Sequence, residues 1–170
     1  MILEKKRLLS GGSFNLGEIN RLMAQLHPDR TKPVFSEERD LREPLGDYYS
    51  HTLIAVDNEA DTERYLGMAT ITFRRNLTKW FSEIHHVVVD SEYHSKGVGE
   101  FLIGELIKIA TEFAMARKAP LEIYFISRPH RTAANVFYIK LGFELIGKAE
   151  GPNGTNLYRY IVQPSIKGLI

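Results

Sequence analysis

Residues 94–99, which read HSKGVG, have the composition of a loop that could bind a phosphate group. The segment follows consecutive valines and precedes a long amphipathic stretch, so it should link a buried strand to the start of a helix. The first N–H groups of a helix lack partners within it and carry the positive end of its dipole. Gly97 and Gly99 have no Cβ to keep a phosphate away from these groups, and Lys96 adds a charge. A tight turn that merely needs glycine is the alternative explanation of the same residues.

Other kinds of site find less support in the residue pattern. No Gly-Lys-Ser/Thr follows the glycines, and the third glycine of a dinucleotide-binding fingerprint is missing. The adjacent His85 and His86 could suggest a metal. Neighbours on a strand point to opposite faces, however, so these two rings could not share one ion, and no HExxH spacing supports a site. No metal is therefore expected.

Composition limits the classes of function. The chain has 170 residues, 44% hydrophobic and 25% charged, which suits one soluble domain over residues 1–170. A net charge of +1 gives no sign of nucleic-acid or membrane-surface binding. No stretch approaches the roughly 20 apolar residues of a membrane helix, and the N-terminus lacks the apolar core of a secretory signal. The absence of cysteine excludes disulfides and thiol catalysis, and it fits the cytoplasm, where we expect the protein.

Hydrophobic periodicity and turn residues predict a mixture of helices and strands. The charged segment 36–49 should be a helix that Ser36 caps and Pro44 breaks. A hairpin is expected at 52–57 and 65–73, around the polar turn NEADTER. The remaining strands are expected at 2–9, 83–90, 121–127, 143–148 and 155–162, the last two around the turn GPNG, and the remaining helices at 14–27, 97–118 and 132–141. This order predicts an α+β fold with a mostly antiparallel sheet and one β-α-β crossover.

Burial can be predicted for parts of these elements. The valines at 87–89 show no polar alternation, so this strand should be buried on both faces. In the helix at 97–118, Glu105 falls among the polar residues opposite the apolar stripe. Gly142 should follow the C-terminus of the helix at 132–141.

Two motifs at their present spacing resemble the GNAT superfamily of acyl-CoA-dependent N-acyltransferases. The loop reads His94-x-x-Gly97-x-Gly99, where the superfamily usually has Gln or Arg at the first position. Residues 137–143, FYIKLGF, resemble the superfamily motif F/L-Y-x-K-x-G-F on the next helix. The resemblance covers essentially the whole chain and is strongest over 83–143. It implies a mixed, mostly antiparallel sheet flanked by helices and splayed between the fourth and fifth strands.

The resemblance also implies acetyl-CoA as the acyl donor. The loop would bind the pyrophosphate of coenzyme A, chiefly through its backbone, at His94, Ser95, Lys96, Gly97, Val98 and Gly99. The pantetheine arm would pair with the main chain of the fourth strand, in the manner of strand addition, at Val87, Val88 and Val89.

Acyl transfer from a thioester to an amine needs a base, because an ammonium group with a pKa of about 10.4 has no lone pair at neutral pH. Some histone acetyltransferases of the superfamily resemble this chain in having a glutamate at the place of Glu83, where it is the base. His85 lies on the same strand face as Glu83 and could replace it or relay its proton. A solvated carboxylate at a strand end is the alternative role for Glu83.

Two residues of the helix at 132–141 complete the expected site. Tyr138 occupies the motif tyrosine and would protonate the departing thiolate, because Phe137 could equally take the packing role against the sheet. A core aromatic is the alternative role of Tyr138. Asn135 lies one turn earlier and would contact the coenzyme A arm, although a helix-surface amide explains it equally well.

These residues together predict an N-acetyltransferase that transfers directly, without a metal. Its partners would be acetyl-CoA and an amine acceptor, either a small molecule or a protein amine, with homodimerisation left open and no nucleic acid or membrane involved. Arg74, Arg75 and Lys79 could favour an anionic acceptor, or they could lie in a solvated loop. The alternative function is a CoA-binding sensor or regulatory module of the same fold that has lost turnover.

Overall fold

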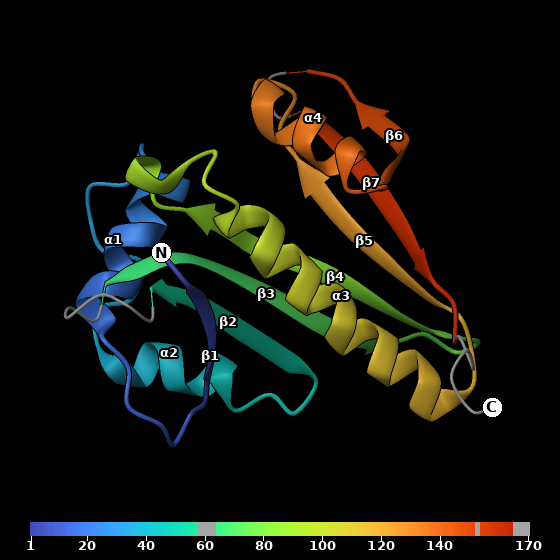
Figure 1. Ribbon diagram of the computed structural model, residues 1–170, viewed down its shortest axis with the longest axis horizontal. Helices are drawn as coiled ribbons and strands as arrows, with labels where there is room; N and C mark the ends of the chain where they lie inside the picture. The colour runs from blue at the N-terminus through green and yellow to red at the C-terminus, as the bar shows by residue number, and fades with distance from the viewer. Residues whose placement is uncertain (58–63, 152–153, 165–170) are drawn as a thin grey trace. The chain divides into compact units, whose positions relative to one another are not determined.

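The computed structural model describes residues 1–57, 64–151 and 154–164 (Figure 1). It divides into two compact units, which are described separately. Unit 1 comprises Met1–Thr72 and His85–Leu106, and unit 2 comprises Phe73–Ile84 and Ile107 onward. The strands form a mixed sheet in the order β1-β2-β3-β4-β5-β7-β6. Organisation as one domain over the whole chain stays a prediction.

The elements follow the predicted order. Unit 1 holds β1 (Leu3–Leu8), α1 (Leu16–Leu26), α2 (Glu38–Leu45), β2 (Ser50–Asp57) and a short 3-10 turn (Ser91–Tyr93). It also holds most of β3 (Tyr65–Arg75), the end of β4 (Trp80–Val89) and the first half of α3 (Val98–Arg117). Unit 2 adds β5, α4, β6 and β7, at Leu121–Ser127, Thr132–Lys140, Glu144–Ala149 and Thr155–Val162. The predicted α+β fold with a mostly antiparallel sheet is therefore confirmed.

Strand pairing within each unit explains the mixed sheet. In unit 1, β2 pairs antiparallel with β1 and with β3, which confirms the predicted hairpin. In unit 2, β7 pairs antiparallel with β5 and β6. Strands β4 and β5 run parallel, with Phe81 opposite Glu122 at one end of the pairing and Ile84 opposite Phe125 at the other. Most of the hairpin turn, 58–63, and the centre of the GPNG turn, 152–153, lie outside the described residues. The expected splay of β4 from β5 stays a prediction.

Helix α2 differs from its prediction at both ends. It begins at Glu38 rather than near Ser36, because Glu37 is the N-cap and forms a capping box with Asp40. The helix ends at Leu45, one residue beyond Pro44, which accordingly lies in the last turn instead of breaking the helix earlier. Gly142, by contrast, follows α4 with a φ of +90°, as predicted for a residue just beyond a helix.

The core of unit 1 forms where α1 covers the sheet. Its buried residues Ile19, Leu22 and Met23 recur at helical spacing and pack with Ile54 of β2 and Met68 of β3. Helix α3 adds a similar stripe, but Glu105 does not lie on its solvent side. This carboxylate is 7% exposed and meets Lys5 of β1 at 2.5 Å. The prediction for Glu105 was wrong because Lys5, an exposed cation of β1 that is distant in sequence, pairs with this buried carboxylate.

Unit 2 has an aromatic core, to which α4, β5 and β7 contribute rings. Tyr138 of α4 lies edge-on to Phe125 of β5, with 4.0 Å between ring centroids, and Phe125 stacks on Tyr158 of β7 at 5.4 Å. Tyr138 is 2% exposed, whereas Phe137 is only half-buried. The expectation that Phe137 takes the packing place and frees Tyr138 from it was therefore wrong, because the tyrosine ring is the one that faces Phe125. Phe143 of the same motif completes the cluster.

Gly67 of β3 marks a close approach inside unit 1. A Cβ at this position would lie 2.8 Å from the carbonyl oxygen of Val88, and 3.1 Å from side-chain atoms of Leu102 and of Val98. Backbone cannot yield as a flexible side chain can, so only glycine allows β3 to lie this close to the end of β4. The position of the segment after Val88 therefore depends on the absence of a side chain at Gly67.

We expect Gly67→Ala to lower the free energy of unfolding by about 1–3 kcal/mol, the usual cost of overpacking. Chemical denaturation followed by circular dichroism would measure it. Gly104→Ala is the matched control, because nothing lies within 4 Å of a Cβ at that position in α3. Alanine should stabilise the helix there by a fraction of a kcal/mol, up to about 1 kcal/mol. Equal effects of the two substitutions would contradict the close approach at Gly67.

Candidate functional site

The loop at 94–99 has the geometry expected of an exposed strand-to-helix connection. Helix α3 begins at Val98, and the N–H of Phe101 closes its first turn on the carbonyl of Gly97 at 2.9 Å. Gly97 has a φ of +82°, in the left-handed region, and nothing lies within 4 Å of a Cβ built on it. The loop therefore needs glycine for its conformation, and the space beside it is open. Both sequence explanations, turn and cradle, are compatible with this geometry.

The side chains of the loop contact the protein itself. His94 Nε2 lies 3.0 Å from the carbonyl oxygen of Val89, which can only accept, so the ring donates this hydrogen bond. Lys96 Nζ lies 4.7 Å from the centroid of the Tyr93 ring, as in a cation–π contact. His94 thus ties the loop to the end of β4. The groups left to face an anion are chiefly the backbone N–H groups at the start of α3.

The end of β4 is less buried than the valine run predicted. Val88 is buried, but Val87 and Val89 are half-buried, so the prediction of burial on both faces was wrong. His86 has a φ of +54°, which interrupts the regular strand just before the valines. His86 is exposed as a residue, but partial desolvation of its ring lowers its pKa, and the nearby His85 and His27 lower the pKa further by repulsion. The imidazole of His86 is therefore neutral at physiological pH.

Glu83, the predicted base, is ion-paired in unit 2. Its Oε2 accepts a hydrogen bond from Arg74 Nε at 2.5 Å. Glu83 is paired in register with Tyr124 of β5, a residue that the sequence analysis did not single out. Tyr124 donates to the Glu122 carboxylate, which also accepts from Lys79 at 2.6 Å. Arg74 and Lys79 are thus engaged by carboxylates of their own unit.

The charges around Tyr124 are settled by these contacts. Hydrogen bonds from Lys79 and then Tyr124 lower the pKa of Glu122, so this carboxylate is ionised. The pKa of Tyr124 is raised, chiefly by donation to Glu122 and then by burial. The alternation of Glu122 and Tyr124 with apolar residues in LEIYFIS was the sequence signal that could have identified this polar strand face.

Tyr138 lies on the opposite face of the paired strands β4 and β5. It contacts Phe125, which is the register partner of Ile84, whereas Glu83 and Tyr124 point to the other face. Burial raises the pKa of Tyr138 to about 12. Its hydroxyl is therefore protonated at neutral pH and can act as a hydrogen-bond donor.

Asn135 makes contacts that neither sequence explanation anticipated. Its Nδ2 donates to the carbonyls of Arg128 and Pro129 at 3.0 and 3.2 Å, and its Oδ1 accepts from the Tyr158 hydroxyl at 3.0 Å. The amide thus fastens the start of α4 to β7. Nearby at the end of β5, the Ser127 hydroxyl is buried and has no hydrogen-bond partner among the described residues.

The predicted site residues fall into the two units. His85, the valines at 87–89 and the loop at 94–99 belong to unit 1, while Glu83, Asn135 and Tyr138 belong to unit 2. Within the described ranges, no cluster of three or more potential metal-ligating residues occurs. None of the described helices is both long enough and apolar enough to cross a membrane.

Comparison with known proteins identifies a family and a fold. The model of the acetyltransferase (GNAT) family matches residues 19–143. An uncharacterized protein of Mycobacterium leprae is 35% identical over 88 residues, which are 52% of this chain and 22% of that protein. This chain therefore matches less than a quarter of the length of that relative.

Solved structures are similar over most of the chain. Arabidopsis thaliana NAA60, in complex with acetyl-CoA, has a TM-score of 0.70 and 16% identity, over 95% of this chain and 99% of that one. An aminoglycoside acetyltransferase from an uncultured soil metagenomic sample, in complex with sisomicin, has a TM-score of 0.70 and 15% identity. The match covers 88% of this chain and 93% of that one. At such identities the likeness shows the fold alone.

Proposed function

We propose that this chain, which belongs to the acetyltransferase (GNAT) family, transfers an acetyl group from acetyl-CoA directly to a primary amine. The observation that carries the proposal is the glycine loop at the start of α3, with open space beside Gly97. The proposed acetyltransferase domain comprises residues 1–170. The proposal includes no metal.

The described residues fit acetyl-CoA in two respects. Backbone N–H groups at the start of α3 suit the pyrophosphate, because glycine at 97 leaves room for close approach. The main chain of Val87 to Val89 would pair with the pantetheine arm, as in strand addition.

Acetyl-CoA supplies the acetyl group as a thioester. In the proposed reaction a new C–N bond forms at the acceptor amine and the C–S bond breaks. Glu83 takes the proton that the amine must lose, directly or through water, and His85 is the alternative base. Arg74 donates to Oε2 of the Glu83 carboxylate at 2.5 Å and thereby orients it.

Tyr138 assists the departing sulfur from the other strand face. A pKa of about 12 keeps its hydroxyl protonated and makes it a weaker acid than a free thiol, whose pKa is about 8.5. It therefore stabilises the developing thiolate by donating a hydrogen bond, and the released thiolate takes its proton from water. With Glu83 on the opposite face, proton removal and sulfur stabilisation occur on different sides of the β4–β5 pair.

Mass spectrometry with acetyl-CoA and a panel of amines tests the proposal, with thiol release measured in parallel. The panel should contain aminoglycosides, polyamines and peptides with free N-termini or lysines, because the acceptor is either a small molecule or a protein amine. Acetylated product with stoichiometric thiol supports acetyl transfer. Tight binding of acetyl-CoA without any product supports a sensor module, which the Arg74–Glu83 ion pair would suit. Failure to bind acetyl-CoA refutes both functions.

We expect Gly97→Val to abolish coenzyme A binding in a protein that still folds. Valine is strained at a φ of +82°, and its branched side chain would fill the space reserved for phosphate. Isothermal titration calorimetry measures the affinity. Gly151→Val is the matched control, since Gly151 has a φ of +105° and nothing within 4 Å of a Cβ, but lies outside the loop. Unchanged affinity in folded Gly97→Val would contradict the phosphate site.

We expect Tyr138→Phe to lower kcat by about 10 to 10³-fold, because the substitution removes only the hydroxyl that assists the leaving sulfur. Acetyl-CoA affinity should persist. Steady-state kinetics under saturating substrates gives kcat, and calorimetry gives the affinity. Tyr158→Phe is the control, a second buried tyrosine of the same cluster whose hydroxyl contacts Asn135. Full turnover in Tyr138→Phe would assign this tyrosine to packing alone.

We expect Glu83→Gln to lower kcat/KM by about 10² to 10⁴-fold, the usual contribution of a general base. The loss should be largest at low pH and partly recover at high pH, because more of the amine is then already deprotonated. A pH–rate profile of both proteins measures this. Glu144→Gln, which removes another arginine-paired carboxylate of unit 2, serves as the control. Parallel profiles with a small constant offset would favour His85 or solvent as the base.

A further inference from the structure

The segment 91–97, which includes most of the glycine loop at 94–99, is not held in place by apolar burial. Residues 91–97 are exposed, except for Tyr93, which is half-buried. The bonds within the loop are short-range turns, such as the N–H of Tyr93 donating to the carbonyl of Asp90 at 2.8 Å. Such turns fix local shape but not the direction in which the loop leaves β4. Some contact with the rest of unit 1 must supply that direction.

Asp90, directly after β4, makes that contact. Its side chain is 2% exposed, and its Oδ2 accepts from Arg21 NH1 at 2.6 Å and from Arg64 NH2 at 2.9 Å. Its Oδ1 accepts from the N–H of Glu92 at 3.2 Å, inside the loop. Its own N–H donates to the carbonyl of Leu66 at 2.9 Å. One carboxylate thus links the loop to α1 and to the start of β3.

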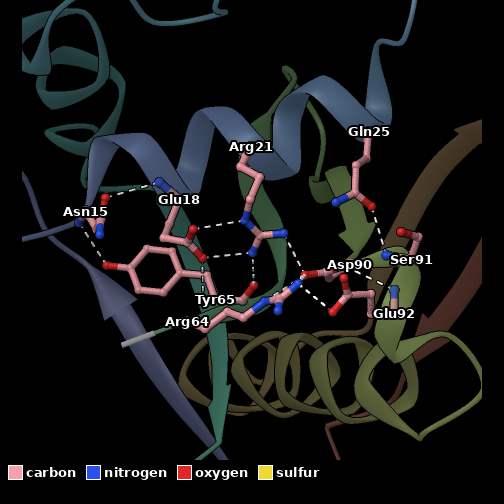
Figure 2. Close-up of polar contacts among 9 residues, drawn as sticks. All are labelled: Asn15, Glu18, Arg21, Gln25, Arg64, Tyr65, Asp90, Ser91 and Glu92. Carbon is pink, nitrogen blue, oxygen red and sulfur yellow. Dashed lines mark hydrogen bonds and ion pairs between the residues drawn. The ribbon is translucent and has the colours of Figure 1, made fainter. Parts of the chain in front are cut away.

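One face of α1 carries Arg21, which binds this carboxylate, and Gln25, which binds the residue after it (Figure 2). Arg21 is itself oriented by two hydrogen bonds to Glu18, at 2.9 and 2.8 Å, and by a third to the carbonyl of Tyr65 at 2.8 Å. One turn further along, Gln25 Oε1 accepts from the N–H of Ser91 at 2.8 Å. Spacings of three and four residues put these side chains on one side of the helix. Figure 2 shows them pointing toward the segment that carries Asp90, Ser91 and Glu92.

The charge state of Asp90 follows from the same contacts. Burial by itself would raise the pKa of its carboxyl group, but hydrogen bonds from the Glu92 N–H, Arg21 and Arg64 outweigh it and lower the pKa. Asp90 is therefore ionised at neutral pH. A buried carboxylate that lost its arginines would be costly, so the carboxylate and both guanidinium groups hold one arrangement.

We propose that Asp90 is a positioning residue, which through Arg21 and Arg64 holds the loop in the conformation that binds the phosphates of coenzyme A. Asp90 is buried and acts through the loop backbone. The inference rests on the proposed function, because it concerns the same donor site. It adds that α1 directs the loop, so that donor affinity depends on residues outside the loop.

The substitution Asp90→Asn separates a positioning role from a simple effect of charge, because the two predict opposite changes in acetyl-CoA affinity. Asp90→Asn removes a negative charge next to the proposed phosphate site, so attraction of a polyanion by charge alone would strengthen. If Asp90 positions the loop, the same substitution weakens binding, because an amide oxygen accepts less strongly than a carboxylate from the two arginines. The two explanations differ in sign.

Acetyl-CoA affinity is measured by calorimetry, and kcat/KM is measured with acetyl-CoA and with S-acetylpantetheine, which has no pyrophosphate. We expect Asp90→Asn to weaken acetyl-CoA binding by about tenfold or more, as for loss of one charge-assisted hydrogen bond. The kcat/KM for S-acetylpantetheine should stay close to that of the wild type. A general structural defect would lower kcat/KM for both donors.

Glu92→Gln is the matched control, because it removes the same charge in the same segment from a side chain that is 65% exposed and forms an ion pair with Arg64. It should leave acetyl-CoA affinity unchanged or slightly stronger. Gln25→Ala removes only the acceptor for the Ser91 N–H and should weaken acetyl-CoA binding by about two- to fivefold. This second variant keeps the test valid if Asp90→Asn does not fold.

Equal or tighter acetyl-CoA binding by folded Asp90→Asn, or equal losses with both donors, would overturn the positioning role. If Asp90→Asn does not fold, unchanged acetyl-CoA affinity in Gln25→Ala would overturn it. Wild-type protein that does not bind acetyl-CoA at all would instead refute the proposed function, so the two failures are distinguishable.

Discussion

A buried carboxylate at the end of β4 is the interaction on which the geometry of unit 1 depends. Asp90 loses its hydration in the fold, and this cost is offset because Arg21 and Arg64 both donate hydrogen bonds to it. A buried charge has few acceptable arrangements, unlike an apolar contact, which tolerates sliding. The carboxylate therefore fixes direction as well as position at the point where β4 gives way to the glycine loop.

A close backbone approach supports the same point in the chain. Gly67 lets β3 lie against the Val88 carbonyl. The carbonyl of Leu66, the residue before Gly67, accepts from the N–H of Asp90. His94 then ties the loop back to Val89. These contacts hold both ends of an exposed segment, so its backbone N–H groups can remain oriented without being buried. An anion site built from main chain needs this combination of accessibility and rigidity.

In unit 2 the alternation of strand faces separates the polar groups. Glu83 and Tyr124 share one face of the parallel β4–β5 pair, whereas Phe125 and Tyr138 belong to the aromatic core on the other. A carboxylate can remain hydrated and ion-paired on the first face, while burial keeps the tyrosine hydroxyl protonated on the second. One strand pair thus provides two environments that suit opposite proton-handling roles.

The sequence by itself determined the element order, the α+β class and the glycine loop at the start of α3, because periodicity and turn chemistry are local properties. It also led to the family through two short motifs. Only the tertiary structure decided which of two adjacent aromatic residues, Phe137 or Tyr138, entered the core, and that Glu105 is buried against Lys5. The pairing of Asp90 with Arg21 and Arg64 likewise left no signal in the spacing of residues. Such contacts join segments far apart in the chain, and whether a charge is buried depends on the partner that folding brings to it.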